Sequence, residues 1–228
     1  MSLLNFSTAV AIWLVFTCTF CFCNLPYENV LTGNLLVSSL IFFNNLNIWV
    51  AACEIILGVH ITYIQEYYKH LREKYKGKER DGCLELLTRP LTIKECFSYK
   101  PWAMMWSTYA LYDPSYQNHE SFGFFIDVGN GFSTIIPCIL VNMAMICPHR
   151  ISSLLVGCVS LATYWQILYG TIIYFVSFFF NRRYANFKPI EIGLFVGLSN
   201  GIWFFFSSLG IYAAVCVLRD GNLDIFGA

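Results

Sequence analysis

The chain has 228 residues, of which 57% are hydrophobic, 18% aromatic and only 12% charged, against about 25% charged residues in an average soluble domain. This composition is typical of an integral membrane protein and argues against a soluble globular domain. The formal net charge is zero, so there is no electrostatic case for a nucleic-acid partner.

Five apolar runs reach the ~20 residues that a helix needs to cross a bilayer. They lie at about 3–23, 40–66, 122–147, 151–180 and 190–218. Because a spanning segment must satisfy its backbone polar groups internally, we predict an all-α integral membrane fold. It forms a single membrane domain over residues 1–228, a five-transmembrane-helix bundle with an intramembrane cavity.

The one long polar segment, at about 67–121, is too charged to enter lipid and is predicted to be a loop at the membrane surface. With five spans, this loop shares one side of the membrane with the N-terminus and the 181–189 loop. That side carries 12 of the 14 Lys and Arg residues. The positive-inside rule therefore predicts that the N-terminus and both loops are cytoplasmic.

Only three ionisable residues lie clearly inside the predicted spans: Glu54, His60 and Asp127. Such residues cost about 2.5–3.5 kcal/mol on insertion scales and usually face the bundle interior. Asp127 shares a helical face with Asn130 and Gly131. This face has room for a ligand or simply for a neighbouring helix. His60 projects about 120° away from Glu54, so it fits either an acid–base role or that of a hydrogen-bonded core residue.

The fourth and fifth spans add aromatic and amide groups, among them Tyr169, Asn200 and Trp203. Aromatic faces that line a cavity can stabilise a cation, although Trp and Tyr are also frequent at membrane interfaces. A carboxyl group buried away from water stays protonated and can donate a proton to an alkene or epoxide. Exclusion of water then prevents capture of the carbocation, so the polar pattern favours acid-catalysed carbocation chemistry.

Four motifs carry a family resemblance: WSTYALYDPSY at 106–116, FGFFIDVGNG at 122–131, YGTIIYF at 169–175 and SNGIWFFF at 199–206. Over residues 102–218 the chain resembles the emopamil-binding protein family, which comprises the sterol Δ8–Δ7 isomerases and their EXPERA-domain relatives. The family signature W-x-x-Y-x-x-x-D-x-x-Y is matched by Trp106, Tyr109, Asp113 and Tyr116.

The resemblance implies roles for several of these residues. Asp127 stands where the family's isomerases carry an intramembrane glutamate of the proton relay, and Asn200 and Trp203 match the residues that contact the reacting steroid. We expect Trp106, Tyr109 and Asp113 at the cavity mouth, although Asp followed by Pro is first of all typical of a turn and the start of a helix.

The second span departs from the family pattern. Sterol isomerases carry His-x-x-x-Glu there, whereas in this chain His60 is followed by Ile64 at that spacing and the acid, Glu54, comes before the histidine. We therefore predict an enzyme that protonates an isoprenoid alkene or epoxide and guides the cation to a cyclised or isomerised product. The alternatives are a sterol Δ8–Δ7 isomerase and a non-catalytic sterol-binding or trafficking protein.

The predicted site has three catalytic residues and a set of substrate-binding residues. The catalytic residues are Asp127, Glu54 and His60; the substrate-binding residues are Asn200, Trp203, Tyr169, Asn130, Trp106, Tyr109 and Asp113. No metal or cofactor motif is present, and proton-driven chemistry needs none. The expected partners are a lipophilic isoprenoid or sterol substrate and membrane lipids, with a homodimer left open. The expected location is the endoplasmic reticulum membrane.

Overall fold

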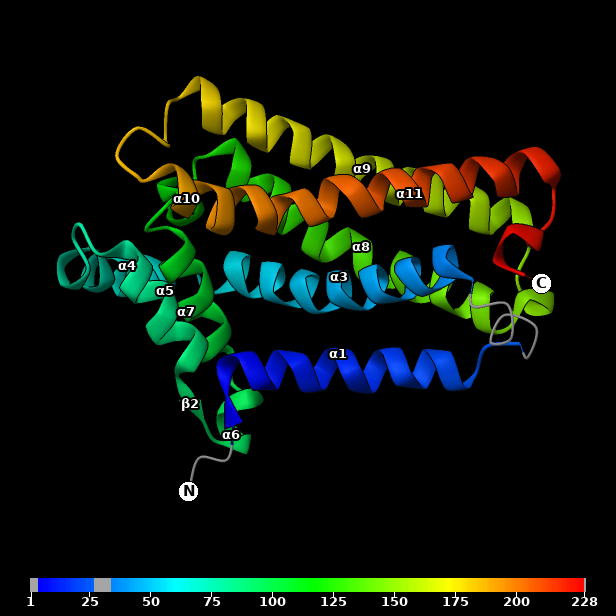
Figure 1. Cartoon of the computed structure of the whole chain (residues 1–228), viewed down its shortest axis with the longest axis horizontal. Coiled ribbons are helices and arrows are strands. Elements are labelled where there is room, and N and C mark those ends of the chain that lie inside the picture. The colour runs from blue at the N-terminus through cyan, green and yellow to red at the C-terminus, as the bar shows by residue number, and fades with distance from the viewer. Residues whose placement is uncertain (1–3, 27–33, 228) are drawn as a thin grey trace.

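The computed structural model describes residues 4–26 and 34–227, in which five helical segments are long and apolar enough to cross a membrane. They are α1 (Phe6–Cys23), α3 (Leu35–Val59), α8 (Phe122–Ile146), α9 (Ser153–Phe180) and the continuous helix Pro189–Asp220. The last comprises α10 (Pro189–Ile192), the π-helical turn η3 (Gly193–Leu198) and α11 (Ser199–Asp220). The prediction of a multi-pass, all-α membrane bundle is confirmed, and Figure 1 shows these helices running side by side.

Several span boundaries differ from the sequence-based prediction, and the largest differences are in the first two spans, where α3 already begins at Leu35 and not at residue 40. The first predicted span began at residue 3, which lies outside the described residues; α1 begins at Phe6, after Asn5 has capped it by accepting a hydrogen bond from the Thr8 amide. The second predicted span, 40–66, ends early because α3 stops at Val59.

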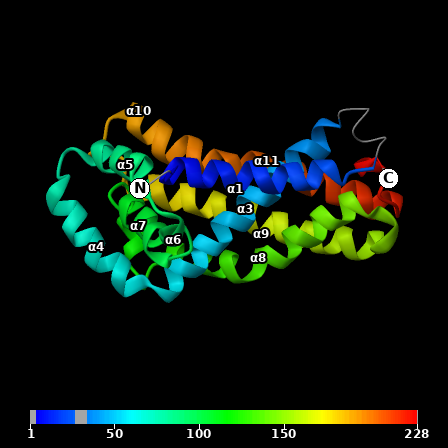
Figure 2. The same ribbon diagram turned by 90° about the horizontal axis from the view of Figure 1, so that it is seen from below.

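The helix breaks at His60, whose φ of −116° and ψ of 29° are not helical. α4 (Ile61–Lys74) then turns away from α3 (Figure 2). Its buried residues, Ile64, Tyr68 and Leu71, recur at the spacing of one helical face, with polar residues on the other side. α4 is therefore an amphipathic helix at the end of the bundle and not the end of a span.

The predicted surface loop, 67–121, is mostly helical. After α4 it contains α5 (Glu79–Thr88), β2 (Pro90–Leu91), α6 (Ile93–Cys96), α7 (Tyr99–Tyr109) and the 3₁₀ turn η1 (Pro114–Gln117). β1 (Leu4–Asn5) pairs antiparallel with β2. Figure 1 shows this region at the end of the bundle that also holds the start of α1 and the α9–α10 connection. The opposite end carries the short turns η2 (Pro148–Arg150) and η4 (Asp224–Phe226) and the C-terminus.

Buried side-chain hydrogen bonds join the spanning helices. Asn44 on α3 donates to Asn142 Oδ1 on α8 at 2.9 Å and accepts from the Tyr164 hydroxyl of α9 at 2.8 Å. Asn47 donates to Thr134 Oγ1 at 2.9 Å. In hydrocarbon such contacts hold helices together, because a polar group without a partner is costly there.

α3 and α8 are in close contact at Gly131. A Cβ atom at this position would lie 2.9 Å from the Ala51 carbonyl oxygen, the Glu54 Cβ and the Ile55 amide nitrogen. Real Cβ atoms do not come so close, so only glycine allows α8 to pack on α3 here. For Gly131, the interpretation as a helix-packing residue is confirmed.

We predict that Gly131→Ala destabilises the bundle, because two of the three crowded atoms belong to the backbone and cannot move aside. Overpacking of this kind costs about 1–3 kcal/mol. Gly129→Ala is the matched control, since nothing lies within 4 Å of a Cβ at that position. Thermal unfolding in detergent micelles should give a lower midpoint for Gly131→Ala alone; equal midpoints for the two variants would contradict the packing described above.

Candidate active site

A cavity of about 220 Å³ lies between α3, α7, η1, α8, α9 and the last spanning helix. Seven of the ten predicted site residues line it: Glu54, Trp106, Tyr109, Asp127, Asn130, Asn200 and Trp203. Residues from four of the five spanning helices, and from α7 and η1 at the end of the bundle, therefore meet in this cavity.

Two carboxyl groups from different helices share this cavity. Glu54 on α3 is only 5% exposed, and within the described residues its Oε2 has no hydrogen-bond partner. Asp127 on α8 lines the same cavity, near enough for its charge to act on Glu54, and Tyr116 lines the cavity with it. Buried polar atoms are rarely left unpaired, so the free oxygen of Glu54 is a candidate for contact with a ligand.

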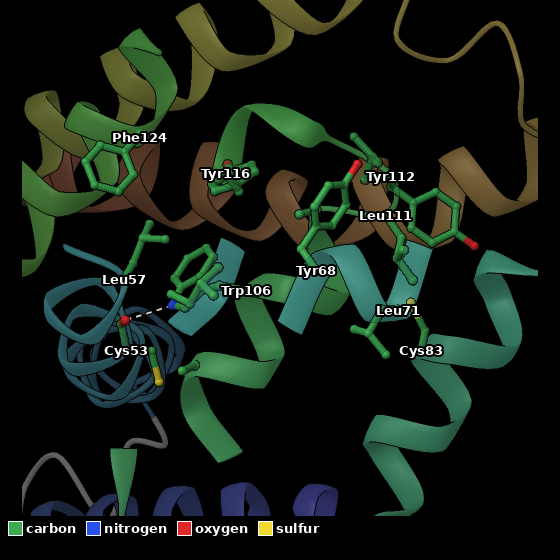
Figure 3. Close-up of a cluster of buried hydrophobic side chains, with 14 of the residues drawn as sticks. Cys53, Leu57, Tyr68, Leu71, Cys83, Trp106, Leu111, Tyr112, Tyr116 and Phe124 are labelled. Atoms are coloured by element: carbon green, nitrogen blue, oxygen red, sulfur yellow. Dashed lines mark hydrogen bonds between the residues drawn. The ribbon is translucent and has the colours of Figure 1, made fainter. Parts of the chain in front are cut away.

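Helix α7 is fixed to α3 next to Glu54. The Trp106 indole nitrogen donates to the backbone carbonyl of Cys53 at 2.7 Å (Figure 3), and Cys53 directly precedes Glu54. The Trp106 ring stacks on Tyr116, with ring centroids 5.4 Å apart, and Tyr109 meets Tyr116 edge-on at 4.9 Å. These aromatic rings lie around the two acids. Contacts within the protein hold the rings in place without a ligand.

Hydroxyl and amide groups from α7, α9 and α11 form a hydrogen-bonded network in the cavity wall. Asn200 Nδ2 donates to the Tyr109 hydroxyl at 2.7 Å, and the hydroxyls of Tyr109 and Tyr174 are 3.0 Å apart. Burial raises the pKa of Tyr109 to about 12, so this hydroxyl stays protonated at physiological pH. Asn200 follows the π-helical turn η3 by two residues, and such turns occur frequently at functional sites.

Three predicted site residues do not line the cavity. His60 sits at the α3–α4 break and stacks on Tyr99, with ring centroids 3.7 Å apart. Tyr169 is 48% exposed and stacks on Trp165, which is also exposed on α9. Neither position provides contact with the two acids.

Asp113, the third of these residues, is fully buried and has a structural role. Its Oδ1 accepts from the Ser115 amide at the start of η1, as expected for Asp followed by Pro. Its Oδ2 accepts from Arg183 Nη1 at 3.0 Å. This ion pair ties η1, which carries Tyr116, to the α9–α10 connection.

Sequence reasoning did not assign three of the aromatic cavity residues to the site. Tyr116 and Tyr174 were noted only as members of motifs, and Trp49 was not singled out. The motifs shared with the emopamil-binding protein family contain both tyrosines and could have identified them as site residues. Trp49 lies in an apolar run and gives no local signal of its role.

We predict that Arg183→Gln destabilises the protein, because it leaves the buried Asp113 carboxylate without its partner. Breaking a buried ion pair costs about 3 kcal/mol. Arg219→Gln removes the exposed pair with Asp220 and should cost only about 0–1 kcal/mol. Thermal unfolding in micelles measures both variants, and a loss in Arg183→Gln no larger than that in Arg219→Gln would refute the structural role of the pair.

No protein-family model matches the chain, and no curated protein sequence matches it significantly. The resemblance to the emopamil-binding protein family therefore stays a prediction that rests on the motif residues. Of those residues, the cavity brings together Trp106, Tyr109, Tyr116, Asp127 and Asn200.

Proposed function

We propose that the chain is a membrane-embedded enzyme that protonates an alkene or epoxide of an isoprenoid lipid and guides the carbocation to a cyclised or isomerised product. The observation that carries the proposal is the convergence of Glu54 and Asp127 in one small cavity walled by indoles and phenols. The resemblance to the emopamil-binding protein family supports the same class of chemistry.

The two acids supply and recover the proton. In the first step the O–H bond of one carboxyl group breaks. Its proton forms a C–H bond with an alkene carbon through the electron pair of the π bond, or an O–H bond with an epoxide oxygen whose C–O bond then breaks, and either route leaves a carbocation. For ring closure, the π electrons of another alkene of the same chain form a C–C bond to the cationic carbon, which moves the cation along the chain. In the last step a C–H bond beside the cation breaks, its electrons form the new alkene, and a carboxylate takes the proton. General acid–base catalysis of this kind contributes about 10²- to 10⁴-fold. Glu54 lines the cavity with an oxygen that has no hydrogen-bond partner within the described residues, so it is available to a substrate, and Tyr116 lines the cavity together with Asp127.

The aromatic wall stabilises the cation between these steps. Trp106 and Trp203 line the cavity together with the acids, and a desolvated cation over such a ring gains about 2 kcal/mol. Asn200, held by Tyr109, is suited to orient a substrate hydroxyl or an acid. Tyr169, which was expected to share in this role, is left out of the proposal because it lies outside the cavity.

The position of His60 bears on the sterol isomerase alternative. A histidine and glutamate acting as a pair would have to meet at the reacting carbon, whereas here His60 stacks on Tyr99 outside the cavity that Glu54 lines. The observation favours a different isoprenoid over a Δ8-sterol. A non-catalytic lipid-binding protein would use the same cavity without turnover, and the experiment below distinguishes the three.

For location, we propose the endoplasmic reticulum membrane, with the α4–α7 end of the bundle in the cytoplasm. The basic residues gather at that end, as the positive-inside rule requires of the cytoplasmic side. The N-terminus is then cytoplasmic as well.

The test is turnover in heavy water by the purified protein in lipid vesicles. An epoxidised farnesyl compound and a Δ8-sterol are supplied separately, and products are analysed by mass spectrometry. We expect a cyclised or isomerised prenyl product from the wild type, and a loss of at least about 100-fold in Glu54→Gln and in Asp127→Asn. Glu66→Gln, at an exposed position on α4, should keep full activity.

Other outcomes select the alternatives. Deuterium in a Δ7-sterol product would identify a sterol isomerase, and sterol binding without turnover of either compound would identify a binding protein. His60→Phe preserves the ring stacked on Tyr99 and should leave turnover unchanged, whereas a 100-fold loss in this variant would restore His60 to the catalytic set.

A further inference from the structure

A second and larger cavity lies beside the active-site cavity, between α1, α3, α6 and α7. It encloses about 700 Å³ and is lined almost entirely by apolar side chains, among them Phe16 from α1, Ala52 and Ile56 from α3, and Phe97 after α6. We call this cavity the α1 groove. Its volume lies within the range of about 300–1,000 Å³ that is usual for ligand pockets.

The groove lies beside the first half of α1, which is held to the rest of the protein at Phe6, at Trp13 and at Cys21; the Trp13 indole nitrogen donates to the Asn45 carbonyl of α3 at 3.3 Å. The only buried residues of α1 are Phe6 and Cys21. Phe6 is held by its amide hydrogen bond to the Arg89 carbonyl and by its ring contact with Trp102, while Cys21 accepts from Asn45 on α3. Ala9 and Ile12 face the groove between the contacts at Phe6 and Trp13. In a bilayer a hydrocarbon chain fills such an apolar groove more favourably than water does.

The α1 groove and the active-site cavity meet at one residue. Trp49 lines both, and among the described residues it is the only one that the two linings share. Its indole meets Trp102 edge-on, with ring centroids 5.9 Å apart. The next turn of α3 continues this division, since Cys53 lines the groove and Glu54 lines the active-site cavity.

The volumes of the two cavities suit different parts of one ligand. The active-site cavity, at about 220 Å³, is smaller than the usual ligand pocket and has room for only part of a prenyl lipid. We propose that the α1 groove binds the non-reacting part of a linear prenyl substrate, which passes Trp49 so that its reacting end lies beside Glu54 and Asp127. This inference rests on the proposed function and names the shape of its substrate: a linear chain that lies in both cavities.

The test is photoaffinity labelling that does not depend on turnover. The probe is an epoxidised farnesyl compound with a diazirine at the end remote from the epoxide, added to the full-length protein in vesicles; labelled residues are mapped by mass spectrometry. We expect label on the groove walls, on α1 and on α3 around Ala52. Ala52→Phe fills the groove from its floor and should reduce this label about tenfold, whereas Ala162→Phe, at an exposed position on α9 outside both cavities, should not.

Two further variants ensure that each labelling result either supports or overturns the proposal. Ala9→Phe fills the groove from the opposite wall and replaces Ala52→Phe if that variant does not fold. Glu54→Gln should keep the groove label, so that loss of turnover with retained label separates a failure of the proposed function from a failure of the groove. The inference is overturned if the filled variants label like the wild type, if the label lies on other helices, or if a palmitoyl chain with the same diazirine labels the groove equally, since the groove would then hold ordinary membrane lipid.

Discussion

The close contact of α3 and α8 at Gly131 is the constraint on which the site depends. The backbone of α3 around Glu54 occupies the space that a side chain at position 131 would need. Asp127 is one helical turn before Gly131 on the same face of α8, so the contact that brings the two helices together also brings the two carboxyl groups together. A bulkier residue at this point would press directly on Glu54 and on the α3 backbone beside it, and would move the two acids apart.

The cap formed by α4–α7 turns this acid pair into an enclosed site. Trp106 reaches across α3 to the Cys53 carbonyl, and the buried Asp113–Arg183 pair holds the turn that carries Tyr116. Both anchors consist of hydrogen bonds and charge in low-dielectric surroundings, where such interactions are strong and an unpaired group is costly. The aromatic wall is thus organised by the folded protein itself, as electrostatic preorganisation requires.

Run length and the rarity of intramembrane charge were sufficient to predict the bundle, the spans and the two acids. The break at His60 was not predicted, because the apolar run continues past it through Ile64, although the amphipathic spacing of α4 was present in the sequence. Asp113 could be identified as a capping residue from Asp followed by Pro, but its partner, Arg183, lies 70 residues away, and no local pattern connects them. Trp49 shows the same limit, since an indole in an apolar run can face lipid, protein or a cavity, and only tertiary packing decides between them.

The account depends most directly on the two carboxyl groups sharing one cavity. Infrared spectroscopy of the protein in bilayers, as a function of pH, can observe each carboxyl group, with Glu54→Gln and Asp127→Asn assigning the bands. If Glu54 and Asp127 interact, removing either acid changes the frequency or the titration of the other. If each carboxyl band is the same whether or not the other acid is present, the groups are apart, and the site described above does not exist.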